Sequence, residues 1–381
     1  EVGRIHKYIA LAYAAKIKLY QAYQQDETTH AVTSINKELL REVVSLCDQV
    51  TASNRYGLLD DFQGLDLVAN ENGKESVFAI QYSMNDGTES AGRINWSNLL
   101  NSPGGGSPYG GDGFFLPSQD LINAYQTDAN GLPDFNYQSK SDYSWAVLNN
   151  GVYTLQNTTP NVDPRLDFVV GRPTITWKTY PDKPCEGWVR DKETYGYNCA
   201  KRFWVSPESS DMFNGWPWGA SQLNWQIIRY ADILLWKAEA LIELNEGNGL
   251  ETARDLINQI RNRARNSAYV KDFNDHSKYA ANYLVNPYPA DVWNQDYARQ
   301  ALRWETRLEK ALEGERFFDL VRWGIVETTM NKYITAESDN RIYYANAHFT
   351  GGKDEYYPVP NNQYGFSGGK YVQNPGYAPF N

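Results

Sequence analysis

The sequence contains few of the side chains that bind metals or form redox centres. Its 381 residues include three Cys and four His, and neither a C-x-x-C nor an H-E-x-x-H motif occurs. A structural zinc site needs about four such ligands at short, regular spacings. We therefore predict no metal site and no cofactor. Cys47 lies within a helical pattern, which favours a buried thiol.

Long apolar runs and an excess of positive charge are also missing. Mean hydropathy is −0.62, and 36 Lys and Arg stand against 46 Asp and Glu, for a net charge of −10. The composition excludes a membrane-spanning protein and argues against nucleic-acid binding. No basic stretch followed by an apolar one opens the chain, so we expect any targeting segment to have been removed or to lie upstream.

Aromatic residues, in contrast, are abundant, with 28 Tyr, 12 Trp and 14 Phe. At so low a hydropathy, many of these rings must lie among polar residues. The sequence therefore indicates a hydrophilic globular protein that is rich in aromatic side chains.

Helical periodicity marks both ends of the chain. Apolar residues recur at helical spacing over residues 4–23 and 34–50, which predicts a pair of packed helices. A second pair is predicted over residues 225–244 and 250–264, and a further helix over residues 296–312. Such pairs are the unit of tetratricopeptide-like repeats. We therefore predict a mainly α fold built from tetratricopeptide-like helical hairpins.

The middle of the chain has a different character, because Gly, Pro, Asn and Asp interrupt it constantly. Strands are expected over residues 77–82 and 166–170, and a short helix over residues 117–125. A loop-rich segment on a helical scaffold typically carries function. We predict one domain, residues 1–381, in three parts: a helical hairpin (1–50), a loop-rich middle with few short strands (51–224) and a C-terminal helical region (225–381).

The loop-rich middle contains the best candidates for a binding site. Sugars present apolar C–H faces that stack on Trp and Tyr rings, and their hydroxyl groups need amide, carboxylate or guanidinium partners. In the segment Trp216-Pro217-Trp218, the neighbouring Gly and Pro residues favour a turn that presents both rings. The alternative is that rings of this segment and its neighbours fill a loop-rich core. We predict six ligand-binding residues: Trp188, Tyr195, Tyr197, Trp204, Trp216 and Trp218.

Cys185 and Cys199 flank a polar segment that contains Gly and Tyr. In an oxidising compartment they could form a structural disulfide worth about 3 kcal/mol, because it would close a loop of about 15 residues. The alternative is two unlinked thiols that lie near each other by chance.

No motif supports catalysis. Residues 365–369 match G-x-S-x-G, but no His follows them and their flanks are loop-like, so a nucleophile elbow is rejected. Glu305, Glu309 and Glu313 recur at helical spacing among Arg and Lys residues. This pattern favours a solvated or ion-paired helix face over a catalytic site.

Several blocks of the sequence resemble the SusD/RagB family, and they follow the family's order. The helix that opens with Arg229-Tyr230-Ala231-Asp232 resembles the signature helix of that family; we interpret Arg229 and Asp232 as structural residues that join helix ends or loops. The other matching blocks are ARDLINQIRNRA (253–264), ETRLEKALEGERFFDLVRW (305–323), YPVP (357–360) and QNPGY (373–377), with shorter ones at 127–133 and 163–166. The resemblance covers nearly the whole chain.

The resemblance implies a non-catalytic surface protein that captures a nutrient, often an oligosaccharide. It also implies a place on the outer surface of the outer membrane of a Bacteroidetes-type bacterium, with a SusC-like TonB-dependent transporter as partner. The family's lipidated Cys and first helices have no counterpart here, so we expect a longer lipoprotein whose only membrane contact is a lipid anchor outside this chain. Two alternatives stay open: the same role with a peptide cargo, and a helical glycoside hydrolase or lyase.

Overall fold

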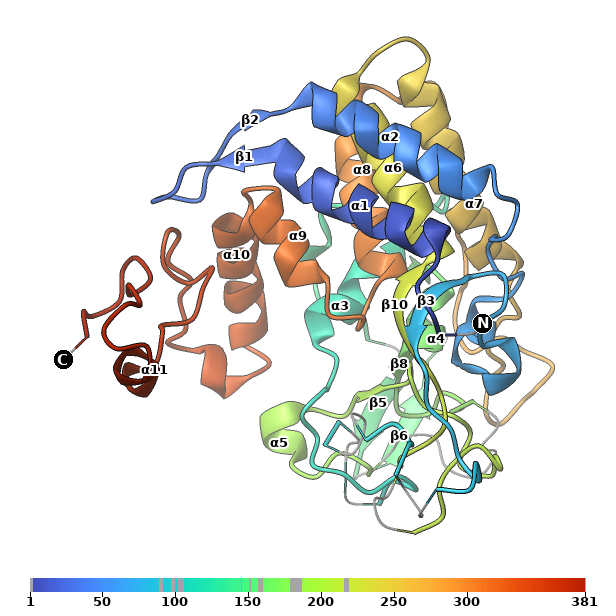
Figure 1. Ribbon diagram of the computed structural model, residues 1–381. Helices are drawn as coiled ribbons and strands as arrows, with labels where there is room; N and C mark the ends of the chain where they lie inside the picture. The colour runs from blue at the N-terminus through green and yellow to red at the C-terminus, as the bar shows by residue number, and fades with distance from the viewer. Residues whose placement is uncertain are drawn as a thin grey trace.

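The protein is described by a computed structural model that covers residues 3–88, 92–96, 100–101, 104, 106–144, 146–150, 152–156, 160–178, 187–215 and 219–380. Helices predominate in these residues, and the strands pair into small two-stranded sheets (Figure 1). The predicted mainly α fold is therefore confirmed. Within the described residues, no helix combines the length and the apolar character that crossing a membrane requires.

Five helices lie side by side and form what we call the helical frame (Figure 1). They are α1 (Lys7–Ala22), α2 (Lys37–Thr51), α6 (Tyr230–Leu244), α7 (Gly249–Asn266) and α8 (Gln295–Glu309). α1 packs against α2, α2 against α6, and α6 against α7 and α8. Buried Ala12 and Ala15 of α1 share one core cluster with Leu40 and Val43 of α2, and their small side chains allow a close approach. Both predicted helical pairs are present.

The ends of these helices follow capping residues in the sequence. The Asn36 side chain accepts hydrogen bonds from the backbone N–H groups of Glu38 and Leu39, which starts α2. Asn245 adopts a left-handed φ of 52° and ends α6. Between α1 and α2, the chain forms a hairpin of β1 (Tyr23–Gln25) and β2 (Val32–Ile35). Cys47 of α2 is fully buried, as predicted, and burial raises the pKa of its thiol to about 12.

Strand β10 (Trp225–Arg229) pairs antiparallel with β3 (Ser76–Ile80) and joins the helical frame to the middle of the chain (Figure 1). β3 confirms the strand predicted over residues 77–82. The helix predicted from Trp225 begins five residues late, because residues 225–229 use their backbone groups to pair with β3.

The strand predicted over residues 166–170 is wrong. Residues Arg165–Val169 form a short helix, α4, and only Val170 belongs to a strand. The cause is local: the Asp163 carboxylate accepts a hydrogen bond from the backbone N–H of Arg165 at 2.9 Å, which turns the chain into a helical start. An apolar run this short does not by itself distinguish a buried strand from a buried helix.

Residues 51–224, which we call the loop region, contain only short elements in the part that the structure describes. The helices are η1 (Phe62–Asp66), η2 (Val68–Asn70), α3 (Gln119–Ala124), η3 (Tyr137–Ser139), α4 and α5 (Lys192–Tyr195). Besides β3, the strands pair as β4 (Gln126–Thr127) with β7 (Asn161–Val162), β5 (Ala146–Asn149) with β6 (Val152–Leu155), and β8 (Val170–Gly171) with β9 (Cys199–Ala200). α3 confirms the short helix predicted over residues 117–125.

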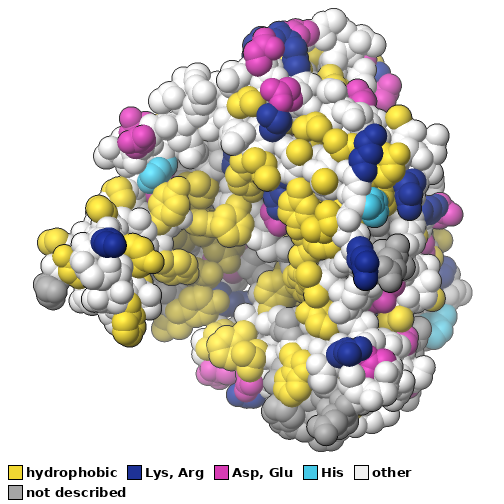
Figure 2. All heavy atoms as spheres, viewed as in Figure 1, with side chains coloured by type: hydrophobic (Ala, Val, Ile, Leu, Met, Phe, Trp, Pro, Cys, Tyr) yellow, Lys and Arg dark blue, Asp and Glu magenta, His cyan; other side chains and the backbone are white. Residues whose placement is uncertain are grey.

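The chain leaves the helical frame through α9 (Arg316–Arg322) and α10 (Val326–Ser338). Residues 339–380, which we call the C-terminal arm, follow and include η4 (Ile342–Tyr344) and α11 (Asn361–Phe366). α10 packs against α3 of the loop region. Figure 2 shows a hollow between the arm and the rest of the molecule, with hydrophobic side chains gathered along it.

Buried ion pairs hold the helical frame and the loop region together. Arg229 donates hydrogen bonds to Glu75 at 2.7 Å, to Glu309 at 3.0 Å and to Glu313 at 2.7 Å. Arg165 donates to Glu305 at 2.6 Å and to Glu309 at 3.2 Å. All of these side chains are almost completely buried. The structural role predicted for Arg229 is confirmed, and the predicted ion-paired face lies in the interior of the protein.

Candidate functional site

Buried aromatic rings in tilted and edge-on contact form one of the cores of the loop region. Tyr109 lies 4.8 Å from Trp204, 6.1 Å from Trp177 and 6.4 Å from Trp188 between ring centroids. The Trp177 indole N–H donates a hydrogen bond to the Tyr109 hydroxyl at 3.1 Å, and that hydroxyl donates to the Val205 carbonyl at 2.7 Å. We call these four rings the aromatic cluster. It fixes loops that have no long apolar stripe of their own.

The burial of this cluster corrects part of the predicted site. Trp188 is 1% exposed and Trp204 is 3% exposed, so neither ring face is open for a sugar to stack on. The core role that was the alternative interpretation therefore applies to both residues. Trp204 keeps one further role, because it also lines a cavity.

The other predicted residues lie elsewhere. Tyr195 ends α5 and is 45% exposed. Tyr197 follows it, half-buried, with the Lys192 ammonium 6.0 Å from its ring centroid. Trp216, Trp218 and Cys185 lie outside the described residues, so their predicted roles stay predictions. Cys199 is buried in β9. The structure thus separates the described candidates into an inner pair and an outer pair.

The Trp204 cavity, as we name it, has a volume of about 450 Å³. Its wall combines the η1 and η2 turns with two later segments of the loop region. The residues that line it are Leu59, Asp60, Asp61, Gln63, Gly64, Asp66, Leu67, Asn70, Lys74, Lys178, Trp204 and Ser206. Carboxylates, amides, ammonium groups and apolar side chains therefore face one space, which suits a ligand with both hydroxyl groups and apolar faces.

A buried ion pair lies at the cavity wall. The Lys178 ammonium is 3.2 Å from the Asp66 carboxylate, which also accepts a hydrogen bond from the Arg202 guanidinium at 3.1 Å. Burial opposes ionisation of Asp66, but the two positive charges outweigh it and lower the pKa of its carboxyl. Burial lowers the pKa of Lys178, although Asp66 partly compensates. The wall thus presents fixed hydrogen-bonding groups of both signs.

The backbone of the same loops is strained. Lys178 has a φ of 45°, Phe203 of 68° and Thr174 of 72°. A non-glycine residue in this region costs about 1 kcal/mol or more, and such residues persist where surrounding structure holds them. Here the adjacent aromatic cluster holds them, because Trp177 precedes Lys178 and Trp204 follows Phe203. The strained conformation places the Lys178 side chain at the cavity.

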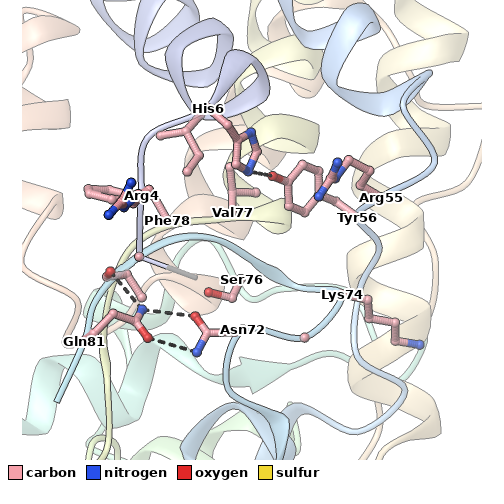
Figure 3. Close-up of a pocket in the computed structure, with 14 residues that line it drawn as sticks. Arg4, His6, Arg55, Tyr56, Asn72, Lys74, Ser76, Val77, Phe78 and Gln81 are labelled. Atoms are coloured by element: carbon pink, nitrogen blue, oxygen red, sulfur yellow. Dashed lines mark hydrogen bonds between the residues drawn. The ribbon is translucent and has the colours of Figure 1, made fainter. Parts of the chain in front are cut away.

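A second cavity, of about 420 Å³, lies between the N-terminal turn of α1 and β3 (Figure 3). Positively charged Arg4, Arg55 and Lys74 line it, and the His6 ring lies 3.3 Å from the Tyr56 hydroxyl. In Figure 3, Arg4 lies at one side of the cavity, and Lys74 points away from it at the other side. These cations do not converge on one point, so we assign no ligand to this cavity.

Sequence reasoning missed Trp177, Lys178 and Asp66. Trp177-Lys178 is an aromatic residue next to a cation in the loop-rich middle. This is the same signal that marks the other predicted ligand-binding residues. Asp66 carries no such signal, because Lys178 and Arg202 approach it from segments more than 100 residues away. Among the described residues, no group of three or more His, Cys, Asp and Glu side chains is arranged to hold a metal ion.

Comparison with known families places residues 74–377 in the SusD family. No curated protein matches the chain. Among solved structures, a SusD superfamily protein from Bacteroides vulgatus is 22% identical, with a TM-score of 0.59 over 95% of this chain and 61% of its own.

Two further solved structures have the same fold. A laminarin-binding SusD-like protein is 20% identical, with a TM-score of 0.60 over 99% of this chain and 64% of its own. Surface glycan-binding protein A from Bacteroides fluxus is also 20% identical, with a TM-score of 0.58 over 98% of this chain and 63% of its own. The chain therefore spans less than two thirds of the length of these structures.

Proposed function

The chain belongs to the SusD family, and from this premise we propose that it is a non-catalytic surface protein that binds an oligosaccharide. The observation that carries the proposal is the Trp204 cavity, whose carboxylate, amide and ammonium groups suit sugar hydroxyls. Two structural neighbours support the ligand class, since one is named for laminarin binding and one for surface glycan binding.

The cavity binds through polar contacts around an apolar patch. Gln63 and Asn70 offer amide groups, Lys178 offers an ammonium group, and Leu59 and Leu67 offer apolar surface. The aromatic cluster holds this wall in place and excludes water behind it. Because the wall is already fixed before the ligand arrives, binding requires little ordering of side chains, which favours affinity.

The proposed site is tested by calorimetry with a panel of neutral oligosaccharides. Lys178→Gly removes the ammonium group and also relieves the positive φ, while Asp66 keeps Arg202 as its partner. We expect this variant to bind about tenfold more weakly, as for the loss of one charged hydrogen bond. The control is Lys370→Ala on the C-terminal arm. If Lys178→Gly binds the oligosaccharides as tightly as Lys370→Ala does, the cavity is not the binding site.

Trp216 and Trp218 are proposed as additional stacking residues, on the sequence argument alone. The double variant Trp216→Ala with Trp218→Ala should weaken oligosaccharide binding. If calorimetry gives the wild-type dissociation constant, these two residues have no part in binding.

The two rival functions differ in what they release or bind. A glycoside hydrolase or lyase would produce new sugar ends, so a rise in reducing sugar or unsaturated products during incubation would refute the non-catalytic proposal. If the cargo is a peptide, calorimetry should detect binding of peptides and no binding of the oligosaccharides.

We further propose that the protein delivers its ligand to a SusC-like TonB-dependent transporter and is held at the outer membrane surface by a lipid anchor. The family membership supports this role. Purification of the native protein from membranes tests it: a large β-barrel partner should co-purify. Recovery of the native protein alone, without detergent, would contradict both the partner and the anchor.

A further inference from the structure

A second group of aromatic rings lies on the surface, where α5 meets η4. Tyr195 and Tyr343 lie 6.2 Å apart between centroids, with their planes tilted by 44°. Tyr343 lies 4.6 Å from Tyr344, which in turn packs edge-on against Tyr333 at 5.5 Å. Tyr195 and Tyr343 are 45% and 51% exposed. We call these four rings the tyrosine shelf. In contrast to the buried aromatic cluster, it keeps two rings open to a ligand.

The shelf is held together by a close contact between two distant segments. Gly196, directly after Tyr195, has a φ of 76°, and a Cβ atom at this position would overlap the Arg341 guanidinium. Arg341 therefore lies directly over Gly196, and its Nη1 donates to the Asn340 carbonyl at 2.6 Å. Only glycine satisfies both the backbone angle and the space. This contact brings Tyr195 and Tyr343 together although 148 residues separate them in the sequence.

A polar cavity of about 610 Å³ is linked to the segment of the shelf by one hydrogen bond of its wall. Asp142 lines it and accepts hydrogen bonds from Asn123 at 2.7 Å and from Asn340 at 3.1 Å. Asn340 lies three residues before Tyr343, so this hydrogen bond joins the cavity wall to the segment that carries the shelf. The cavity is lined by Gln126, Thr127, Asp128, Ala129, Asp134, Lys140, Ser141, Asp142, Tyr143, Ser144, Pro160 and Asn161.

The charges of this cavity restrict the chemistry of its ligand. Asp128, Asp134 and Asp142 line it with a single Lys140, which pairs with Asp134. A carboxylated or sulfated sugar would be repelled by the remaining carboxylates. Hydroxyl groups, in contrast, donate well to carboxylates, and the exposed faces of Tyr195 and Tyr343 suit the apolar side of a sugar ring.

We propose that the tyrosine shelf and the Asp142 cavity form a second glycan site, which holds neutral sugar units of a long polysaccharide. This inference rests on the proposed function. While the Trp204 cavity binds one part of the polysaccharide, the shelf binds another part of the same molecule. The second contact is then intramolecular, which raises the affinity for polymers but not for short oligosaccharides.

The experiment compares a polymer with its own short fragment. Affinity electrophoresis is performed with laminarin, amylopectin and galactomannan in the gel, and calorimetry with the hexasaccharide of each. The variants are Tyr195→Ala with Tyr343→Ala, and Tyr357→Ala as the control, because Tyr357 is 90% exposed and outside the shelf. Both shelf tyrosines are half exposed, so we expect the double variant to fold, which circular dichroism checks.

The expected result is a loss of polymer affinity by about tenfold or more, with an unchanged dissociation constant for the hexasaccharide. Gly196→Ala keeps both rings but displaces Arg341. It should also lose affinity for the polymer and keep the dissociation constant for the hexasaccharide. Wild-type polymer affinity in the double variant, or an equal loss for polymer and hexasaccharide, would overturn the second site but leave the proposed function intact. If the wild-type protein binds none of these glycans, the proposed function and the second site both fail.

Discussion

The junction between the helical frame and the loop region is held differently from the part of the loop region that lies farther from the frame. At the junction where the frame meets the loop region, Arg229 and Arg165 are enclosed by carboxylates from both parts. The loop region, farther from the frame, has the aromatic cluster as its centre. Ion pairs therefore hold the junction with the long helices, whereas the irregular chain combines packed rings with ion pairs of its own, such as Arg172–Asp167 and Lys178–Asp66.

The difference follows from what each part can offer. Helices supply continuous apolar stripes. The apolar burial in the frame offsets the desolvation of the buried charges, which fix the position of the loop that contacts them. Loops supply no such stripe, and large rings bury the most apolar area per residue. The abundant rings of this protein are therefore divided between two tasks: the aromatic cluster packs the interior of the loop region, and the tyrosine shelf remains open.

The largest expected effect tests the ionic junction. Arg229→Met leaves Glu75, Glu309 and Glu313 with one fewer buried cation, and we expect a loss of about 3–5 kcal/mol in the free energy of unfolding. Chemical denaturation measures it. Arg41→Met is the matched control, because Arg41 pairs with exposed Glu38 and Glu246, and solvent screens such pairs so that their loss changes the stability little. Similar losses in both variants would remove the distinction between buried and exposed pairs.

The next effect tests the aromatic cluster. Trp177→Ala opens a void beside Gly171, where the indole ring fills the space that a Cβ atom would need. We expect a loss of about 3 kcal/mol. Hydrogen exchange should accelerate in residues 187–205 and stay unchanged in α6 and α7. Uniform acceleration throughout the chain would show that the two regions unfold as one unit. Trp96→Ala, at an exposed ring, serves as the control.

The predicted disulfide would add a covalent support to the loop region alone. If Cys185 and Cys199 are linked, a reductant should lower the free energy of unfolding by about 2–3 kcal/mol. Mass spectrometry without reductant should give a chain mass that is lower by two hydrogens than the mass with three free thiols. Cys47 should remain a thiol. Alkylation of both Cys185 and Cys199 in the unreduced, unfolded protein would contradict the link.

The smallest effect tests the contact between α10 and α3. Glu337 of α10 is buried and accepts a hydrogen bond from the backbone N–H of Asp120. Burial raises the pKa of its carboxyl to about 7, although the hydrogen bond from the Asp120 backbone N–H and the charge of Arg341 lower it. The negative charges of Asp120 and Asp142 act in the same direction as burial. A raised pKa means that folding favours the neutral carboxyl. The stability that neutral Glu337 contributes is therefore fully present below about pH 4.5 and is lost as the pH rises through 7.

Glu337→Gln keeps the neutral shape at every pH. We therefore expect it to match the wild type near pH 4.5 and to be more stable by about 1 kcal/mol at pH 8. Denaturation at a series of pH values measures the difference. A variant that is less stable than the wild type at pH 8 would show that the charged carboxylate has a favourable partner.

The helices were predictable because their signal is local. The stripes of α1, α2, α6 and α7 recur every three or four residues. The strand predicted over residues 166–170 failed for a local reason, the hydrogen bond from Arg165 to Asp163. Two other predictions were incomplete because the decisive partner lay far away in the sequence. Residues 225–229 pair with β3, some 150 residues earlier, and so become a strand before α6. The face of Glu305 and Glu309 was predicted as either solvated or ion-paired, and only Arg165 from the loop region decides that it is ion-paired and buried.

The candidate site was less predictable than the fold. Sequence reasoning chose Trp188 and Trp204 by composition, yet Tyr109 and Trp177 enclose them. No sequence pattern marks Tyr343 as a candidate, because it lies in the irregular C-terminal arm and its neighbour Tyr195 is distant in the sequence. No pattern along the chain reports which side of a ring another segment will cover.

Local sequence accounts for the helical pairs, the loop-rich middle, the lack of a membrane-spanning helix within the described residues and the many rings among polar residues. These properties depend on composition and on the 3.6-residue period, which neighbouring residues set together. Which rings are buried and which stay exposed depends on the packing of distant segments. Exposure is a property of contacts between distant segments, such as Tyr109 on Trp204 or Arg341 on Gly196, and no local rule contains it.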